Sequence, residues 1–136
     1  MNRVVLGAVS LLLASCSSEP ECLQVDRACA PLYSPAFSEL YRRTLAPTCA
    51  QAGGFCHAAD GGAGGMSFVD EESAYRALTS PGSDGEPRAV AGDPSCSLLV
   101  RRTSATDSSF VMPPGMPLSE AERCVLIRWV GEGAKR

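Results

Sequence analysis

The sequence predicts a small all-α domain that is rich in loops and stabilised by disulfides. Four segments repeat their apolar residues at helical spacing, and none alternates apolar and polar residues over the length of a strand. Glycine- and proline-rich connections separate these segments, and the chain has seven cysteines. With so few large apolar residues, burial alone gives little stability, so disulfides or a bulky apolar cofactor must contribute.

The N-terminus has the layout of an export signal. An apolar stretch from Val4 to Ala14 follows Arg3, is too short to span a membrane, and ends at Leu13-Ala14-Ser15-Cys16. This ending resembles the lipobox of bacterial lipoproteins, which implies that residues 1–15 are removed as a signal peptide and that Cys16 is acylated. The alternative is an ordinary signal peptide followed by an unmodified cysteine. We expect a protein held on a membrane of the bacterial cell envelope by its lipid.

Residues 16–34 are expected to form a tether and a cysteine-containing extension, and residues 35–136 the folded domain. The first helix is predicted from Pro35 onward, and Pro47 is expected to end it. Its buried face consists of residues at i, i+3, i+4 and i+7, namely Phe37, Leu40, Tyr41 and Thr44.

Three further helices are predicted after the first. One runs from its N-cap, Asp70, to Leu78, and a short one starts at Ser95. The last follows Ser119, which forms a capping box with Glu122. It should be the most buried helix, because it is apolar nearly all round through Cys124, Val125, Leu126, Ile127, Trp129 and Val130.

The charged residues exclude one class of partner. Lys and Arg total 12 and Asp and Glu total 15, giving a formal net charge of -3, and no basic stripe occurs. Nucleic acid is therefore not an expected partner. No G-x-S-x-G motif is present and the chain has one histidine, so a hydrolytic triad is not indicated and the protein is not expected to be an enzyme.

The one histidine, His57, directly follows Cys56. In the motif C-x-x-C-H, two cysteines attach haem through thioethers and the histidine is the proximal iron ligand. Here Gly53 stands in the place of the first cysteine, and the nearest cysteine upstream is Cys49, which gives C-x6-C-H. Two glycines in the insertion, Gly53 and Gly54, would let the loop bulge so that both thiols reach the porphyrin.

Two methionines lie in a proline-rich loop before the last helix. Met112 and Met116 are each followed by a proline, and a thioether on a stiff loop suits a distal haem ligand. Met112 is the first choice and Met116 is its rival.

Together these motifs resemble a cytochrome-c-like domain of the small type found in exported planctomycete and myxobacterial proteins. The resemblance covers roughly residues 35–136. It rests on Cys56-His57, Ala74-Tyr75-Arg76-Ala77-Leu78, Gly92-Asp93-Pro94, Ser97-Leu98-Leu99, Met112-Pro113-Pro114-Gly115, Leu118-Ser119, Trp129-Val130 and Gly133-Ala134. It implies one haem c, one-electron transfer, a redox partner protein, and packing of Phe37 and Tyr41 against Trp129.

The resemblance also assigns the haem-binding residues. His57 would be the proximal ligand and Met112 the distal one, with Cys56 anchoring the porphyrin, alone or together with Cys49. The C-x6-C-H spacing leaves a second hypothesis open, in which Cys49 and Cys56 form a disulfide. The protein would then be a haem-free, disulfide-stapled binding or structural module that contacts another envelope protein.

The other cysteines are expected to form disulfides, as is usual after export. Cys96 and Cys124 are predicted to pair with each other, because both lie on helix faces that should meet in the core. Cys22 and Cys29 are candidates for a second bridge. A zinc site is a weaker alternative, because the candidate ligands are not separated by the two to four residues that zinc sites favour. It would draw on Cys22, Cys29, Cys49, Cys56 and His57.

Overall fold

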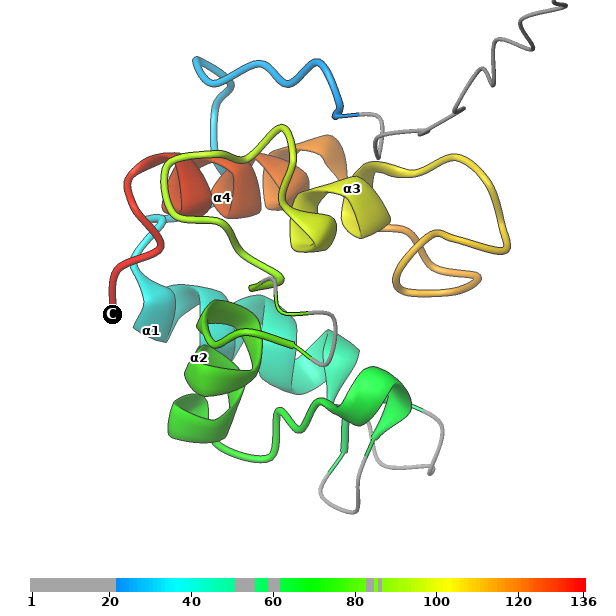
Figure 1. Ribbon diagram of the computed structural model, residues 1–136. Coiled ribbons are helices and arrows are strands. Elements are labelled where there is room, and N and C mark those ends of the chain that lie inside the picture. Colours follow the sequence, from blue (N-terminus) through cyan, green and yellow to red (C-terminus); the bar gives the residue numbers. More distant parts are fainter. Residues whose placement is uncertain (1–21, 51–55, 59–61, 83–84, 86) are drawn as a thin grey trace, which may run out of the picture.

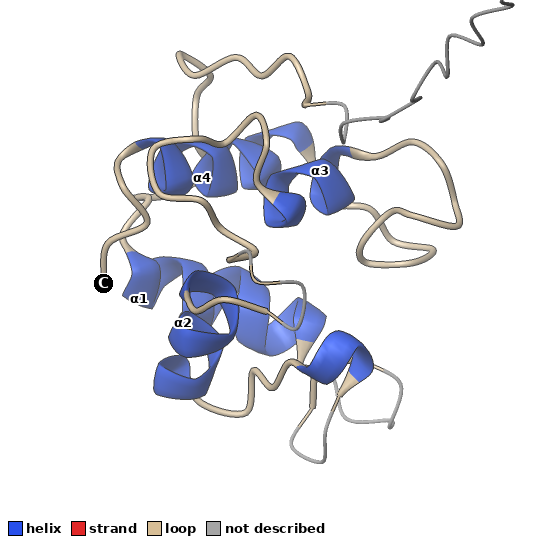
Figure 2. Cartoon of the chain, viewed as in Figure 1, coloured by secondary structure: helices blue, strands red, loops and turns tan. Residues whose placement is uncertain are grey.

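The computed structural model describes residues 22–50, 56–58, 62–82, 85 and 87–136. The predicted signal peptide and Cys16 lie outside the described residues. Within the described ranges the chain contains helices, one isolated bridge between Pro81 and Pro87, and no strand. The elements are α1 (Phe37–Leu40), η1 (Tyr41–Cys49), η2 (Ala63–Gly65), α2 (Glu71–Thr79), α3 (Leu98–Ser104) and α4 (Glu120–Gly131). The predicted all-α, loop-rich fold is confirmed, and Figure 2 shows how much of the chain is loop.

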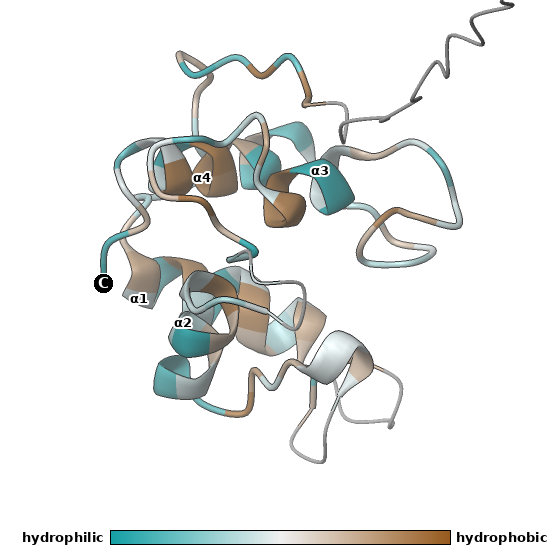
Figure 3. Ribbon diagram, in the orientation of Figure 1, coloured by the Kyte–Doolittle hydropathy of each residue, from teal (hydrophilic) through white to brown (hydrophobic). Residues whose placement is uncertain are grey.

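The helices form two layers. In Figure 1, α3 and α4 lie side by side above α1, its continuation η1, and α2. The layers meet where α1 crosses α4, and there the rings of Phe37 and Trp129 lie 5.1 Å apart. Tyr75 of α2 packs edge-on against Phe37 at 5.0 Å. Apolar residues are concentrated on α4, on the start of α3 and on η1, as Figure 3 shows, so the core lies between the layers.

The two best start signals in the sequence both form as predicted. Asp70 caps α2 by accepting a hydrogen bond from the backbone N–H of Ser73 at 2.8 Å. Ser119 and Glu122 form the reciprocal capping box of α4. The last helix has more buried residues than any other described helix, namely Cys124, Val125, Leu126, Trp129 and Val130. Burial of its apolar surface fixes α4 as the central element of the core.

The first helix does not end at Pro47, contrary to the prediction. After Leu40 the helix widens to π-type pairing, which continues to Cys49, and the N–H of Ala50 bonds to the carbonyl of Leu45 at 2.9 Å. In an α-helix, the proline ring clashes with the carbonyl four residues earlier. A wider turn moves that carbonyl away from the ring, so the helix continues for two residues beyond Pro47.

The third helix starts later than predicted, at Leu98 instead of Ser95. A turn occupies the preceding residues because Asp93 holds it in two ways. Its carboxylate accepts a hydrogen bond from the N–H of Cys96 at 3.1 Å, and its carbonyl accepts one from the hydroxyl of Ser97 at 2.7 Å. The side chain of Asp93 thus competes with the helix for the first donors of the segment.

The predicted disulfide between Cys96 and Cys124 is wrong, and so is the bridge between Cys22 and Cys29. Cys22 pairs with Cys96, with Cα atoms 4.5 Å apart, and Cys29 pairs with Cys124, with Cα atoms 5.9 Å apart. The N-terminal extension runs over the α3–α4 layer (Figure 1), so its two cysteines reach Cys96 and Cys124 directly. The prediction placed Cys96 in a helix facing the core, whereas it lies in the turn before α3.

Backbone hydrogen bonds also hold the extension in place. The N–H of Leu23 bonds to the carbonyl of Ser95 at 2.9 Å, and that of Leu32 bonds to the carbonyl of Ala121 at 3.0 Å. The extension is therefore an integral part of the fold. Among the described residues, no helix is long and apolar enough to cross a membrane.

Candidate functional site

A cavity of about 500 Å³ is lined by the histidine, both cysteines and the first-choice methionine that the sequence proposed for haem binding. Its walls come from η1, η2, α2, α3, α4 and the loop before α4. Most of the lining is apolar, including Leu45, Met66, Phe68, Leu78, Leu98, Leu99, Pro113, Pro114, Leu118 and Leu126. The size and apolar character are those of a small-molecule or cofactor site. Cys49, Cys56, His57 and Met112 are also part of the lining.

His57 is held at the cavity wall by its backbone. Its N–H bonds to the carbonyl of Cys49 at 3.0 Å, and its carbonyl accepts the N–H of Phe68 at 2.8 Å. The imidazole ring packs 4.9 Å from the ring of Phe68. Gly62 approaches this segment so closely that a Cβ there would lie 2.6 Å from the carbonyl oxygen of Cys56. Backbone contacts on several sides thus fix the position of the imidazole.

The imidazole of His57 has an unmet hydrogen-bonding requirement. Within the described residues, its Nδ1 atom is buried and has no hydrogen-bond partner. Burial lowers the pKa of His57 below its ordinary value of 6.5, and the positive charge of Arg88 adds to this effect. The ring is therefore neutral at pH 7. A buried nitrogen without a partner is costly, so Nδ1 is a candidate to receive a partner that the described residues do not supply.

The two thiols of the cavity are not joined to each other. Cys49 ends η1, and Cys56 precedes His57; both are half-buried and free. Burial, with a smaller contribution from Cys56, raises the pKa of Cys49 to about 12. Cys49 is therefore a neutral thiol at physiological pH.

Met112 lines the cavity, whereas its rival Met116 is 68% exposed and lies away from it. The backbone N–H of Met112 bonds to the carbonyl of Arg102 at 3.0 Å, which ties its loop to α3. The structure thus places Met112, His57 and both thiols around one space and leaves Met116 outside it.

A zinc site does not fit these positions. Cys22 and Cys29 are consumed by disulfides on the outer side of the α3–α4 layer. The described residues contain no group of three or more His, Cys, Asp or Glu residues able to hold a metal ion. Haem fits better, because it needs an apolar cavity, one imidazole and one thioether.

Sequence analysis missed two arginines that line the cavity, Arg88 and Arg102. For Arg102, the sequence did contain a clue, which is the absence of an acidic partner along its helix. On α3 it has no acidic residue three or four positions away, so no ion pair along the helix explains its charge. Arg88 gave no comparable signal, because it lies in a loop.

Comparison with known proteins supports the assignment of the domain. Residues 54–115 match the family model described as Planctomycete cytochrome C, a little under half of the chain. The matched segment contains Cys56, His57 and Met112, but not Cys49 or α4. No curated protein and no solved structure matches the chain. The family match and the helical architecture together support a cytochrome-c-like domain.

Proposed function

We propose that this protein is a membrane-anchored, cytochrome-c-like lipoprotein that carries one haem c and transfers single electrons in the cell envelope. One observation carries the proposal. His57, whose buried Nδ1 has no partner among the described residues, lines the same cavity as Met112, Cys49 and Cys56. The match to a cytochrome family over the segment containing three of these residues supports it further.

The histidine, the methionine and the two cysteines of the cavity each have a role in this proposal. His57 serves as the proximal iron ligand, in keeping with its neutral ring and its fixed backbone. Met112 serves as the distal ligand, on a loop that Pro113 and Pro114 stiffen. Cys56 anchors the porphyrin, and Cys49 is the candidate for a second thioether. When bound, haem supplies a one-electron couple, and a His/Met ligand pair raises its potential relative to two histidines.

The remainder of the proposal concerns location and partner. The signal-like N-terminus and the lipobox-like Leu13-Ala14-Ser15-Cys16 support export and lipidation. The partner would be a redox protein of the same envelope. The protein would act as a carrier and not as an enzyme, since the sequence has no signature of a hydrolytic site.

The first test is the intact mass and visible spectrum of the chain without its lipid, produced in a host that attaches c-type haem. A haem-sized mass increment that survives thiol reduction supports the proposal. Met112→Leu should then alter the spectrum of the ligated iron, whereas Met116→Leu serves as a matched control and should not. An apo mass in the same host contradicts haem attachment.

The C-x6-C-H spacing favours a second candidate function. The two disulfides already staple the fold without haem, so a haem-free module that contacts another envelope protein is the alternative. In the same experiment, a colourless protein that gains two hydrogens per opened bridge supports this candidate.

A further inference from the structure

Two cysteines remain thiols in a fold that joins its other described cysteines in disulfides. Among the described cysteines, Cys49 and Cys56 are free, whereas the other four form two bridges. Both thiols line the same apolar cavity. Sulfur donors beside an apolar space are ligands that soft metal ions prefer. The pair is therefore a candidate metal site in the chain without haem.

The backbone brings the two thiols close together. The carbonyl of Cys49 accepts the N–H of His57 at 3.0 Å, and His57 directly follows Cys56. This hydrogen bond places the end of η1 against the segment that carries the second thiol. Burial, and then the charge of Cys56, raises the pKa of Cys49 to about 12. An electrostatic contribution of this kind requires a short distance between the two groups.

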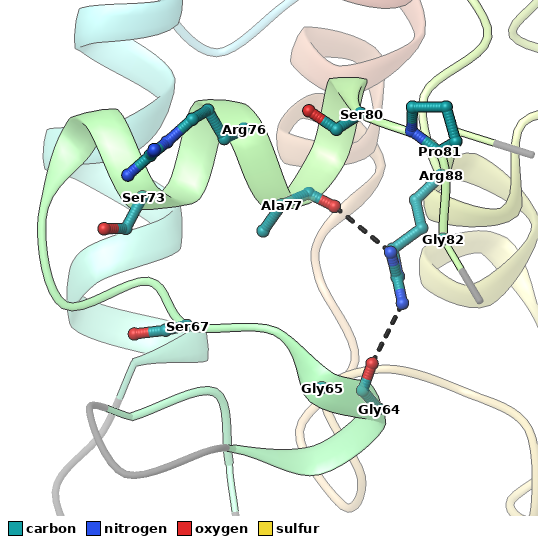
Figure 4. Close-up of a pocket in the computed structure, with 10 residues that line it drawn as sticks. All are labelled: Gly64, Gly65, Ser67, Ser73, Arg76, Ala77, Ser80, Pro81, Gly82 and Arg88. Atoms are coloured by element: carbon teal, nitrogen blue, oxygen red, sulfur yellow. Dashed lines mark hydrogen bonds between the residues drawn. The ribbon is translucent and has the colours of Figure 1, made fainter.

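The turn of η2 holds the second thiol from the other side. The carbonyl of Cys56 accepts the N–H of Ala63 at 3.3 Å. Arg88 ties this turn to α2, because its guanidinium donates to the carbonyls of Gly64 and Ala77 at 2.9 and 3.4 Å, as Figure 4 shows. Both cysteines thus lie on backbone that is held before any ligand binds, which lowers the ordering cost of binding.

The number of available ligands decides which ion fits. The described residues contain no group of three or more His, Cys, Asp or Glu residues able to hold a metal ion. Zinc sites use four protein ligands, or three with a water molecule. Cu(I) differs, because this soft ion is stable with only two thiolate ligands. Two thiols without a third such ligand therefore favour Cu(I) over Zn²⁺.

We propose that Cys49 and Cys56 form a two-coordinate Cu(I) site in the haem-free chain. Each thiol gives its proton to solvent, so two S–H bonds are replaced by two Cu–S bonds, and neither copper nor sulfur changes its oxidation state. The site goes beyond the proposed electron carrier, because thioether formation would consume the same sulfur atoms. A chain would hold Cu(I) at this site or covalent haem, and not both.

The test transfers Cu(I) from a coloured chelator to the protein. The haem-free chain without its lipid, produced in a host that does not attach c-type haem, is kept anaerobic with its disulfides intact. It is titrated into the Cu(I) complex of bicinchoninate, whose colour is lost as copper moves to the protein. Cys49→Ser and Cys56→Ser each remove one ligand. Thr48→Ala is the matched control, since Thr48 lines the same cavity next to Cys49. Unfolding midpoints identify a serine variant that fails to fold, and the alanine variant of the same cysteine then replaces it.

The wild-type chain should take up one Cu(I) and release two protons. Each cysteine variant should bind Cu(I) at least about 100-fold more weakly, and Thr48→Ala should stay within about twofold of wild type. Zn²⁺, followed with a zinc indicator, should bind at least about 100-fold more weakly than Cu(I). The site is overturned by a wild-type chain that takes up no Cu(I), by full uptake in either cysteine variant, by an equal loss in Thr48→Ala, or by equal affinity for Zn²⁺.

The chain from a host that attaches c-type haem separates the two proposals. A haem-bearing chain should take up no Cu(I), and uptake equal to that of the haem-free chain overturns the site, because copper then binds elsewhere. If that host attaches no haem while the haem-free chain binds Cu(I) through both cysteines, the proposed electron carrier fails and the copper site stands. If haem is attached and the haem-free chain takes up no Cu(I), the copper site alone fails.

Discussion

The two disulfides cross each other in sequence, and this gives a quantitative prediction about stability. Cys22 joins Cys96 across 74 residues, and Cys29 joins Cys124 across 95. Each bond can be removed by replacing both of its cysteines with alanine. Taken alone, loops of these lengths correspond to about 4.5 to 4.7 kcal/mol of unfolding free energy.

The bonds are not independent, so the loss of one should cost less than this figure. With one bond intact, the other closes a loop of only about 35 residues, made of the short stretches from Cys22 to Cys29 and from Cys96 to Cys124. A loop of that length corresponds to about 3.8 kcal/mol. Both single removals should therefore cost about the same, despite their different separations. Removing both should cost about 8 kcal/mol, most of the stability of a small domain.

Guanidinium unfolding of the haem-free protein measures these costs. Trp129 is the sole tryptophan and only 2% exposed, so its fluorescence reports the loss of the core. Both single variants should remain folded, and the double variant should be unfolded at 25 °C. Costs below about 1 kcal/mol would refute the reasoning, because they would mean that the extension is not restrained as the loop argument requires. Costs that follow sequence separation would refute the crossed-loop calculation.

Three other predictions concern the cavity and the helix caps. Gly62→Ala puts a Cβ 2.6 Å from the carbonyl oxygen of Cys56, so it should lower stability by about 1–3 kcal/mol and abolish porphyrin uptake. Gly131→Ala is the control, since its Cβ would meet nothing closer than 3.9 Å; equal effects of the two would contradict the argument. Ser119→Ala removes the capping box of α4 and should cost about 1 kcal/mol in denaturant unfolding, and no change would show that the cap is dispensable. Alkylation of Cys49, followed by peptide mass, should be slow at pH 8 and rise about tenfold per pH unit, because only the thiolate reacts and the pKa lies at about 12. A rate that levels off between pH 8 and 9 would contradict that pKa.

Local signals in the sequence were sufficient for part of the fold. Asp70 and Ser119 each combine a capping side chain with an apolar stretch behind it, and both helices begin there. The boundary at Pro47 was missed because the rule for proline assumes α-helical pairing, whereas η1 is wider. The disulfides were missed for a different reason. Pairing depends on where the N-terminal extension crosses the helices, and nothing local to the four cysteines encodes that path.

The candidate site was predictable for those residues whose chemical role follows from a sequence motif. His57, Met112 and the two thiols were identified by residue type and order, and the structure brings them to one cavity. The choice between Met112 and Met116 needed the loop's path, since each methionine has a proline after it. Arg88 was out of reach, because its place at the cavity follows from tertiary contacts with Gly64 and Ala77.

Phe37 packs on Trp129, as the resemblance implied, but the polar contact of Tyr41 is elsewhere. Its hydroxyl donates a hydrogen bond to the carbonyl of Val69 at 3.1 Å, ahead of α2. Tyr41 packs its ring partly against the core, and this hydrogen bond satisfies its polar end. The aromatic contact could be inferred from the family pattern, whereas the hydrogen bond depends on the loop that carries Phe68 and Val69.

The crossed disulfides also determine whether a single cut by a protease releases a fragment. A single backbone cut between Cys22 and Cys29 leaves the N-terminal piece attached through Cys96, and a cut between Cys29 and Cys96 leaves two bridges between the halves. A cut between Cys96 and Cys124 leaves the pieces joined through Cys29. Exposed loops are where nicking concentrates, and this domain is mostly loop. One nick anywhere from residue 23 to residue 123 therefore releases no fragment, so a cleaved molecule keeps its whole domain on whatever holds its N-terminus.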